Sequence, residues 1–205
     1  MVHQVNEEFK NVKIDFHIVK RSLTGWEDEC GDTGISVVSD NQCFVALVDV
    51  LGHGKEAYDV ALIAEKYLSE HYRMGLIEMM NGLHEHLKGT RGAVAALCRI
   101  NLNDGVLLYS GIGNINTRVL GSQNLILMPR DGIIGYMSGS PKESQLKLYS
   151  GDTLILTSDG VKEHINFECY PELLNGSAKE IANNIVELFA KGNDDSSCIV
   201  LRYGI

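Results

Sequence analysis

Short apolar runs rich in β-branched residues recur along this 205-residue chain, and turn residues separate them. The first such runs, at residues 16–23, 35–39 and 43–50, are typical of β-strands. Asp40-Asn41-Gln42 fits a hairpin loop between the second and third runs, and Asn103-Asp104-Gly105 predicts a tight turn between two later ones. Links of hairpin length join antiparallel neighbours, so they argue against a doubly wound parallel sheet.

Two amphipathic segments interrupt the strands, with apolar residues at three- and four-residue steps over 55–73 and a second helix over 76–87. Further strands are predicted over 93–101, 105–111, 117–120, 125–128, 145–149 and 153–157, followed by a helix over 178–190 and a last strand over 197–202. This mixture predicts an α+β fold. Two packed antiparallel sheets with helices outside would bury strands that are apolar on both faces, and that architecture is an αββα sandwich.

Size and composition narrow the classes of protein to which this chain can belong. We expect a single domain over residues 1–205, because the chain has no repeat, no low-complexity tract and no linker. The net charge is −9, whereas a nucleic-acid binder usually carries a basic surface. The five cysteines form no CxxC pair, and the polar N-terminus and the lack of a run of about 18 apolar residues argue against a signal peptide or membrane span. We therefore expect a cytoplasmic protein.

Acidic residues stand at the ends of apolar runs, next to glycine. Asp49 ends one run, Asp159 follows another and precedes Gly160, and Asp32 lies between Gly31 and the run at 35–39. Asp194 and Asp195 stand before the last strand. Strand ends are rigid mounts, and carboxylates that converge without a matching set of His and Cys indicate hard cations such as Mg²⁺ or Mn²⁺. Taken singly, each of these residues is more typical of a turn or a helix cap, and only their shared context favours a cation site.

The sequence gives less support to a histidine acid, a serine nucleophile or a dinucleotide site. His53 lies four residues after Asp49 in a glycine-flanked loop, where it could donate a proton to a leaving oxygen or simply begin a helix. The segment 135–139 misses the GxSxG spacing of a serine nucleophile. Gly111-Ile112-Gly113-Asn114 lacks the third glycine of a dinucleotide fingerprint and precedes a strand-like run rather than a helix.

Several motifs, in this order, resemble the PPM metal-dependent protein phosphatases of the SpoIIE-like branch. They are Gly31-Asp32, Val48-Asp49-Val50-Leu51-Gly52-His53-Gly54, Arg91-Gly92-Ala93-Val94-Ala95, Tyr109-Ser110-Gly111-Ile112-Gly113-Asn114, Gly151-Asp152, Thr157-Ser158-Asp159-Gly160 and Asp194-Asp195-Ser196-Ser197. The resemblance runs from about residue 30 to the C-terminus. It implies an αββα sandwich with a binuclear Mn²⁺ or Mg²⁺ centre between the sheets.

By position, the resemblance implies a set of metal ligands. Asp49 would bridge both cations, and the main-chain carbonyl of Val50 would be a further ligand. Asp159 and Asp194 would complete one cation, with Asp194 favoured over Asp195, and Asp32 would serve the other directly or through water. Catalysis would fall to Asp49 and Asp159, with His53 as a candidate general acid, since Leu51 occupies the position where eukaryotic relatives carry a histidine.

The resemblance also implies the reaction and its partners. A metal-activated water would attack the phosphorus of phosphoserine or phosphothreonine in STAS-domain regulators. A stand-alone catalytic domain of this branch implies a stressosome feedback phosphatase, whose partners are phosphorylated STAS-domain stressosome proteins. Two other readings stay open: a non-catalytic pseudophosphatase that binds a STAS partner, and a two-metal phosphoesterase acting on another substrate.

Overall fold

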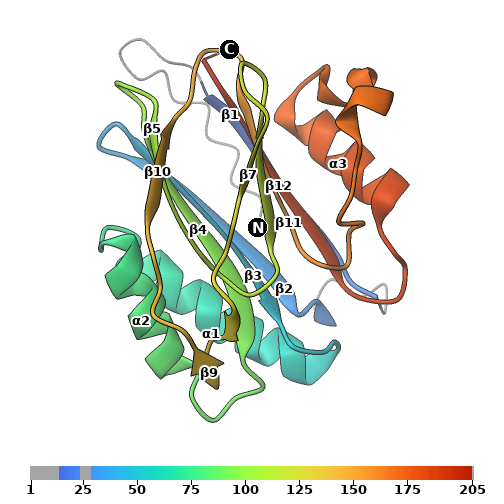
Figure 1. The fold of residues 1–205 in the computed structure, drawn as a ribbon. Coiled ribbons are helices and arrows are strands. Elements are labelled where there is room, and N and C mark those ends of the chain that lie inside the picture. Colours follow the sequence, from blue (N-terminus) through green and yellow to red (C-terminus); the bar gives the residue numbers. More distant parts are fainter. Residues whose placement is uncertain (1–13, 24–28, 205) are drawn as a thin grey trace.

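The computed structural model describes residues 14–23 and 29–204, and the architecture is an αββα sandwich (Figure 1). The strands are β1 (Ile14–Arg21), β2 (Asp32–Ser39), β3 (Gln42–Val50), β4 (Ala93–Asn101), β5 (Val106–Ile112), β6 (Asn116–Leu120), β7 (Leu125–Leu127), β8 (Gly132–Ile133), β9 (Met137–Ser138), β10 (Ser144–Lys147), β11 (Thr153–Thr157) and β12 (Ser196–Tyr203). The helices are α1 (Lys55–His71), α2 (Leu76–His86) and α3 (Ala178–Phe189), with short 3₁₀ turns at Phe167–Cys169 and Pro171–Leu174.

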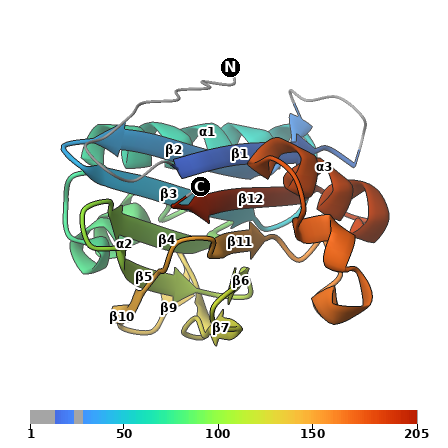
Figure 2. The ribbon, with the colours of Figure 1, turned by 90° about the horizontal axis from the view of Figure 1, so that it is seen from above.

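The strands form two five-stranded antiparallel sheets. One has the order β10-β5-β4-β3-β2 and the other the order β1-β12-β11-β6-β7, while β8 and β9 form a small separate hairpin. The predicted α+β class and αββα arrangement are therefore confirmed. In the view from above, β1 and β12 lie against β2, where the two sheets face each other (Figure 2).

Three apolar layers hold the sandwich together. The middle layer lies between the sheets and includes Leu47, Leu154 and Leu201. The layer under α1 and α2 forms because the apolar stripe of each helix faces the β2–β5 sheet, and the layer under α3 forms in the same way against β11 and β12. Strands such as β3 are buried on both faces because each lies between a helix layer and the other sheet.

Local signals fix the ends of several elements. Asp40 and Asn41 both have positive φ, at 52° and 60°, which is the geometry of a two-residue hairpin turn between β2 and β3. A capping box between Ser177 and Glu180 begins α3. Among the described residues, no helix is long and apolar enough to cross a membrane.

Several predicted boundaries differ from the structure by one to three residues, and three differences bear on the fold. The first strand covers Ile14–Arg21, two residues earlier than predicted, because pairing with β12 decides which residues belong to it. β2 starts at Asp32 rather than at residue 35, so this acid is part of the sheet. The β8–β9 hairpin was not predicted, since strands of two residues show no periodicity.

Candidate metal centre

Two of the predicted acids are direct neighbours in one sheet. Asp32 opens β2 and Asp49 stands next to last in β3, and the antiparallel register pairs the two residues with each other. Their side chains emerge on the face toward the other sheet, because the alternate residues Thr33 and Val48 turn toward α1. Directly opposed residues have Cβ atoms about 5 Å apart, and like charges at that spacing repel.

Burial and this repulsion disfavour the charged forms of both acids. Asp32 is 2% exposed, and burial, together with the charges of Asp195 and Asp194, raises the pKa of its carboxyl to about 7, although the hydroxyls of Ser197 and Ser158 offset part of the rise. Burial raises the pKa of Asp49 to about 9, helped by the negative charges of nearby acids. At neutral pH the pair therefore favours a proton or a compensating cation.

The other sheet brings two more acids to the same place. Asp159 follows β11 and Asp194 precedes β12, and both are half-buried. The charges of Asp32, Asp159 and Asp194 all contribute to the raised pKa of Asp49, so these three carboxylates lie close enough to Asp49 to repel its charge. They belong to different sheets and to distant parts of the chain, so only the packing of the sandwich brings them together.

Asp195, next to Asp194, uses both carboxylate oxygens to bind backbone amides. It is 3% exposed, and its two carboxylate oxygens accept hydrogen bonds from the backbone amides of Leu23, at 2.7 Å, and Gly31, at 2.5 Å. Charged hydrogen bonds of this kind are strong, and they tie the segment before β2 to the loop before β12. Asp195 thus has little capacity left for a cation, whereas the Asp194 carboxylate has one such contact, through Oδ1 from the Asp195 amide at 2.9 Å.

The donor set suits a hard divalent cation. Asp32 Oδ2 is buried and has no hydrogen-bond partner among the described residues, so one carboxylate oxygen is left to be satisfied by something else. Within that part of the chain, no three His, Cys, Asp or Glu side chains already have the spacing of a complete metal site. Mg²⁺ typically binds through one or two carboxylates and keeps several waters, so it does not require a closed cage of protein ligands.

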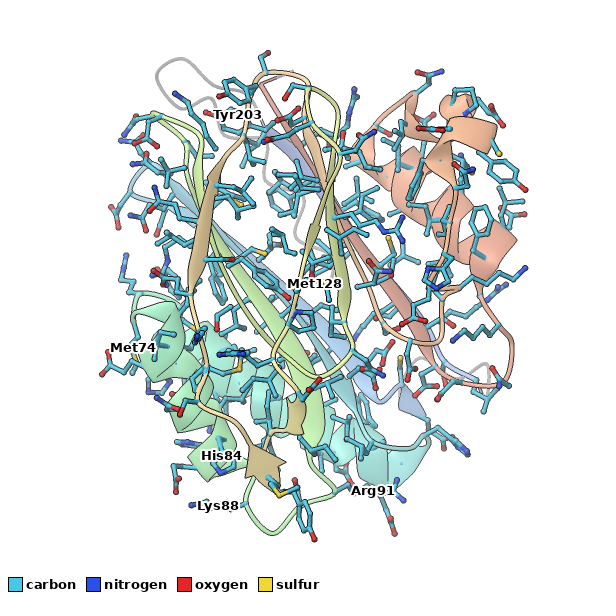
Figure 3. The ribbon with its side chains drawn as sticks, viewed as in Figure 1. Met74, His84, Lys88, Arg91, Met128 and Tyr203 are labelled. Carbon is cyan, nitrogen blue, oxygen red and sulfur yellow. The ribbon has the colours of Figure 1, made fainter. Side chains whose placement is uncertain are left out.

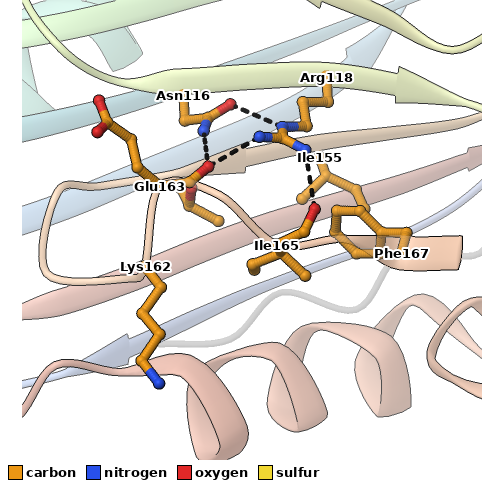
Figure 4. A pocket seen from close by; sticks show the side chains of 8 residues that line it. Asn116, Arg118, Ile155, Lys162, Glu163, Ile165 and Phe167 are labelled. Atoms are coloured by element: carbon orange, nitrogen blue, oxygen red, sulfur yellow. Dashed lines mark hydrogen bonds between the residues drawn. The ribbon is translucent and has the colours of Figure 1, made fainter. Parts of the chain in front are cut away.

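The loop after Asp159 is held by Arg118 on β6. Its guanidinium donates to the carbonyls of Glu163, at 2.8 Å, and Ile165, at 3.1 Å, and Asn116 donates to the Glu163 carbonyl at 2.8 Å (Figure 4). At the start of the same loop, a Cβ on Gly160 would lie 1.8 Å from the Asp195 carbonyl oxygen, so only glycine fits. The loop that carries Asp159 is therefore fixed from both sides.

The rim of the site is formed by the loop 51–54 between β3 and α1. His53 is exposed in this loop and makes no hydrogen bond with a described residue, and Leu51 beside it is 37% exposed. Arg91 lies beside α1 (Figure 3), 3.6 Å from Glu56, and packs against the backbone of this loop. The structure thus puts His53 on the surface, in the loop that follows Asp49 and Val50, without fixing its ring.

The sequence prediction missed one polar contact. Asn114, after β5, donates a hydrogen bond from Nδ2 to Asp159 Oδ2 at 2.9 Å. It belongs to the segment Gly111-Ile112-Gly113-Asn114, which is part of a motif shared with the PPM phosphatases but to which the sequence prediction gave no role in the site. The available signal was a polar residue placed after a strand and a glycine, the same context as the acids.

Comparisons with known proteins bear on this site. The family model "Stage II sporulation protein E (SpoIIE)" matches residues 39–204. The phosphoserine phosphatase RsbX of Bacillus subtilis (strain 168) is 24% identical over 208 residues, covering 98% of this chain and 92% of the relative.

Two solved structures are similar to this chain over most of its length. A chain from a structure described as "The bacterial stressosome: a modular system that has been adapted to control secondary messenger signaling" is 30% identical, with a TM-score of 0.85, covering 93% of this chain and all of that one. The crystal structure of RsbX in complex with magnesium has a TM-score of 0.78 at 19% identity, covering 97% of this chain and 98% of that one. These similarities confirm the relation that the motifs predict.

Proposed function

The chain belongs to the SpoIIE family and is a PPM-type protein phosphatase, and from this premise we propose that it hydrolyses phosphoserine or phosphothreonine on STAS-domain stressosome proteins. The observation that carries the proposal is the convergence of four acids from two sheets, two of which have pKa values raised to about 7 and about 9. Acids in such a field need a compensating positive charge to be ionised at neutral pH.

We propose a binuclear Mg²⁺ or Mn²⁺ centre held by five groups. Asp49 would be the ligand shared by both cations, because the charges of Asp32, Asp159 and Asp194 all act on its carboxyl. Asp159 and Asp194 would complete one cation, Asp32 would serve the other, and the main-chain carbonyl of Val50 would be a further ligand. The hydrogen bonds of Asp195 support Asp194 over Asp195 as the ligand.

Two bound divalent cations would supply a water of lowered pKa and offset negative charge on the phosphoryl oxygens. The chain's own residues keep the acids in place: Asp32 and Asp49 through strand pairing, Asp159 through Arg118 and Asn114. Asp49 and Asp159 then act in catalysis by orienting the reacting groups. His53, exposed at the rim, is the proposed donor of a proton to the leaving serine oxygen.

The substrate class rests on the relatives. RsbX is a phosphoserine phosphatase, and the 30% identical chain comes from a structure described as the bacterial stressosome. We extend both properties to this chain, with phosphorylated STAS-domain proteins as partners, and we place the enzyme in the cytoplasm. The five cysteines are all free, which fits a reducing compartment.

The test is Mn²⁺-dependent release of phosphate from a phosphorylated STAS-domain protein, compared with release from a small chromogenic phosphate ester. We expect the phosphoprotein to be the far better substrate and EDTA to abolish both activities. Asp49→Asn should lose activity, while Asp131→Asn, an exposed acid outside the site, should keep it. Release from the ester alone would favour another phosphoesterase, and no release from either despite bound Mn²⁺ would favour a pseudophosphatase.

A further inference from the structure

We propose that Asn114 is a positioning residue that fixes the Asp159 carboxylate for cation binding, and thereby raises the affinity of the centre for Mn²⁺ or Mg²⁺. The inference rests on the proposed function, because it takes Asp159 to be a ligand. Its basis is the 2.9 Å hydrogen bond from Asn114 Nδ2 to Asp159 Oδ2, which joins loops 45 residues apart in the sequence.

The backbone dictates where Asn114 lies. Gly113 has a φ of 99°, and a Cβ there would lie 2.1 Å from Val94 Cγ1, so the chain turns at this point in a way that only glycine allows. The amide of Gly113 donates to the carbonyl of Arg130 at 2.8 Å, and the amide of Arg130 donates to the carbonyl of Gly111 at 2.8 Å. The amide group of Asn114 is therefore delivered to Asp159 by a loop that is held on both sides.

The chemistry of the contact favours a positioning role. Asp159 lies close enough to Asp49 for its charge to be felt there, so repulsion would otherwise push the two carboxylates apart. The bond to Oδ2 resists that movement and leaves Oδ1 for a cation. Because the amide is neutral, it orders the carboxylate without adding a positive charge that would compete with the metal, as a lysine or arginine would.

Asn114 has no packing role that would confuse the test. Its side chain is exposed, and it makes no other hydrogen bond with a described residue. Asn183 on α3 is a matched control, since it is also exposed and donates from Nδ2 to a carbonyl oxygen, that of Lys179, at 2.7 Å, but on a helix surface away from the acids. Truncating either residue to alanine removes one amide donor.

The experiment is calorimetric titration of Mn²⁺ into the metal-stripped full chain. We expect Asn114→Ala to weaken Mn²⁺ binding by about tenfold or more, because losing the hydrogen-bond partner of a metal ligand typically costs about 10- to 100-fold in affinity. Asn183→Ala should bind Mn²⁺ like wild type. The Mn²⁺ concentration for half-maximal activity should rise by the same factor. The melting temperature of the metal-free variant should match that of wild type, which a merely structural contact would not predict.

The outcomes separate this inference from the proposed function. If Asn114→Ala binds Mn²⁺ as tightly as wild type while Asp159→Asn does not, the positioning role is wrong and the metal centre stands. If Asp159→Asn also binds Mn²⁺ like wild type, the proposed ligand set itself fails. A lower melting temperature of metal-free Asn114→Ala with unchanged Mn²⁺ affinity would assign the hydrogen bond to folding and overturn the inference.

Discussion

Replacing Asp49 by asparagine should stabilise the metal-free protein while it destroys the metal centre. The side chain keeps its shape but loses the charge that burial and three neighbouring acids disfavour. The pKa of Asp49 is about 9 in the folded chain against 3.8 for a free side chain, so at pH 7 the folded state must take up a proton that the unfolded state has released.

The magnitude follows from that difference. Between 3.8 and pH 7 lie about three pH units, and each corresponds to about 1.4 kcal/mol, so the proton uptake costs up to about 4 kcal/mol. Relaxation of the site reduces this value, and we expect Asp49→Asn to raise the free energy of unfolding by about 2–4 kcal/mol at pH 7.

The pH dependence of the free energy of unfolding tests the direction of this effect. A carboxyl whose pKa is raised on folding leaves stability intact below the unfolded pKa, and that stability is lost as the pH rises through the folded pKa. For Asp32 and Asp49 the loss should spread from about pH 4 to about pH 9. The difference between Asp49→Asn and wild type should therefore vanish at pH 4 and grow toward pH 9.

Urea unfolding of EDTA-treated protein at pH 4, 7 and 9 measures this, with Asp131→Asn as the control. Mn²⁺ at 1,000 times its dissociation constant should cancel or reverse this order, because a ligand at that concentration adds about 4.1 kcal/mol to wild type only. A metal-free Asp49→Asn that is less stable than wild type at pH 7, or equally stabilised at pH 4, would refute the reasoning.

Four further substitutions test how the loops are held and which acid binds the cation. Asp195→Asn should lower the free energy of unfolding by about 2–3 kcal/mol in chemical denaturation, because two backbone amides lose a charged acceptor. Asp194→Asn should instead weaken Mn²⁺ binding with little change in stability. The reverse pattern would exchange the roles of the two acids. Arg118→Ala should cost about 2 kcal/mol and speed hydrogen exchange at residues 163–165, and unchanged exchange there would exclude the clamp. Gly160→Ala should lower the melting temperature more than Gly75→Ala, where a Cβ meets open space, and equal effects would contradict the close approach to Asp195.

The sequence alone predicted the helices and most strands, and it singled out the acids of the candidate site. Apolar periodicity located the three helices and most strands to within two residues, because period 2 and period 3.6 reflect which faces are buried. The acids beside glycine at strand ends were also visible, since a charged residue that ends an apolar run is a local pattern. That pattern indicated hard cations before any contact was known.

The tertiary structure decided which partners each acid has. Local sequence cannot show that Asp32 pairs directly with Asp49, because strand register depends on partners elsewhere in the chain. It also cannot tell Asp194 from Asp195, since they are adjacent and identical in type, and only the amides of Leu23 and Gly31 distinguish them. Asn114 gained its partner for the same reason: it precedes β6 and Asp159 follows β11, and the antiparallel register that pairs Asn116 with Thr157 brings the two side chains together.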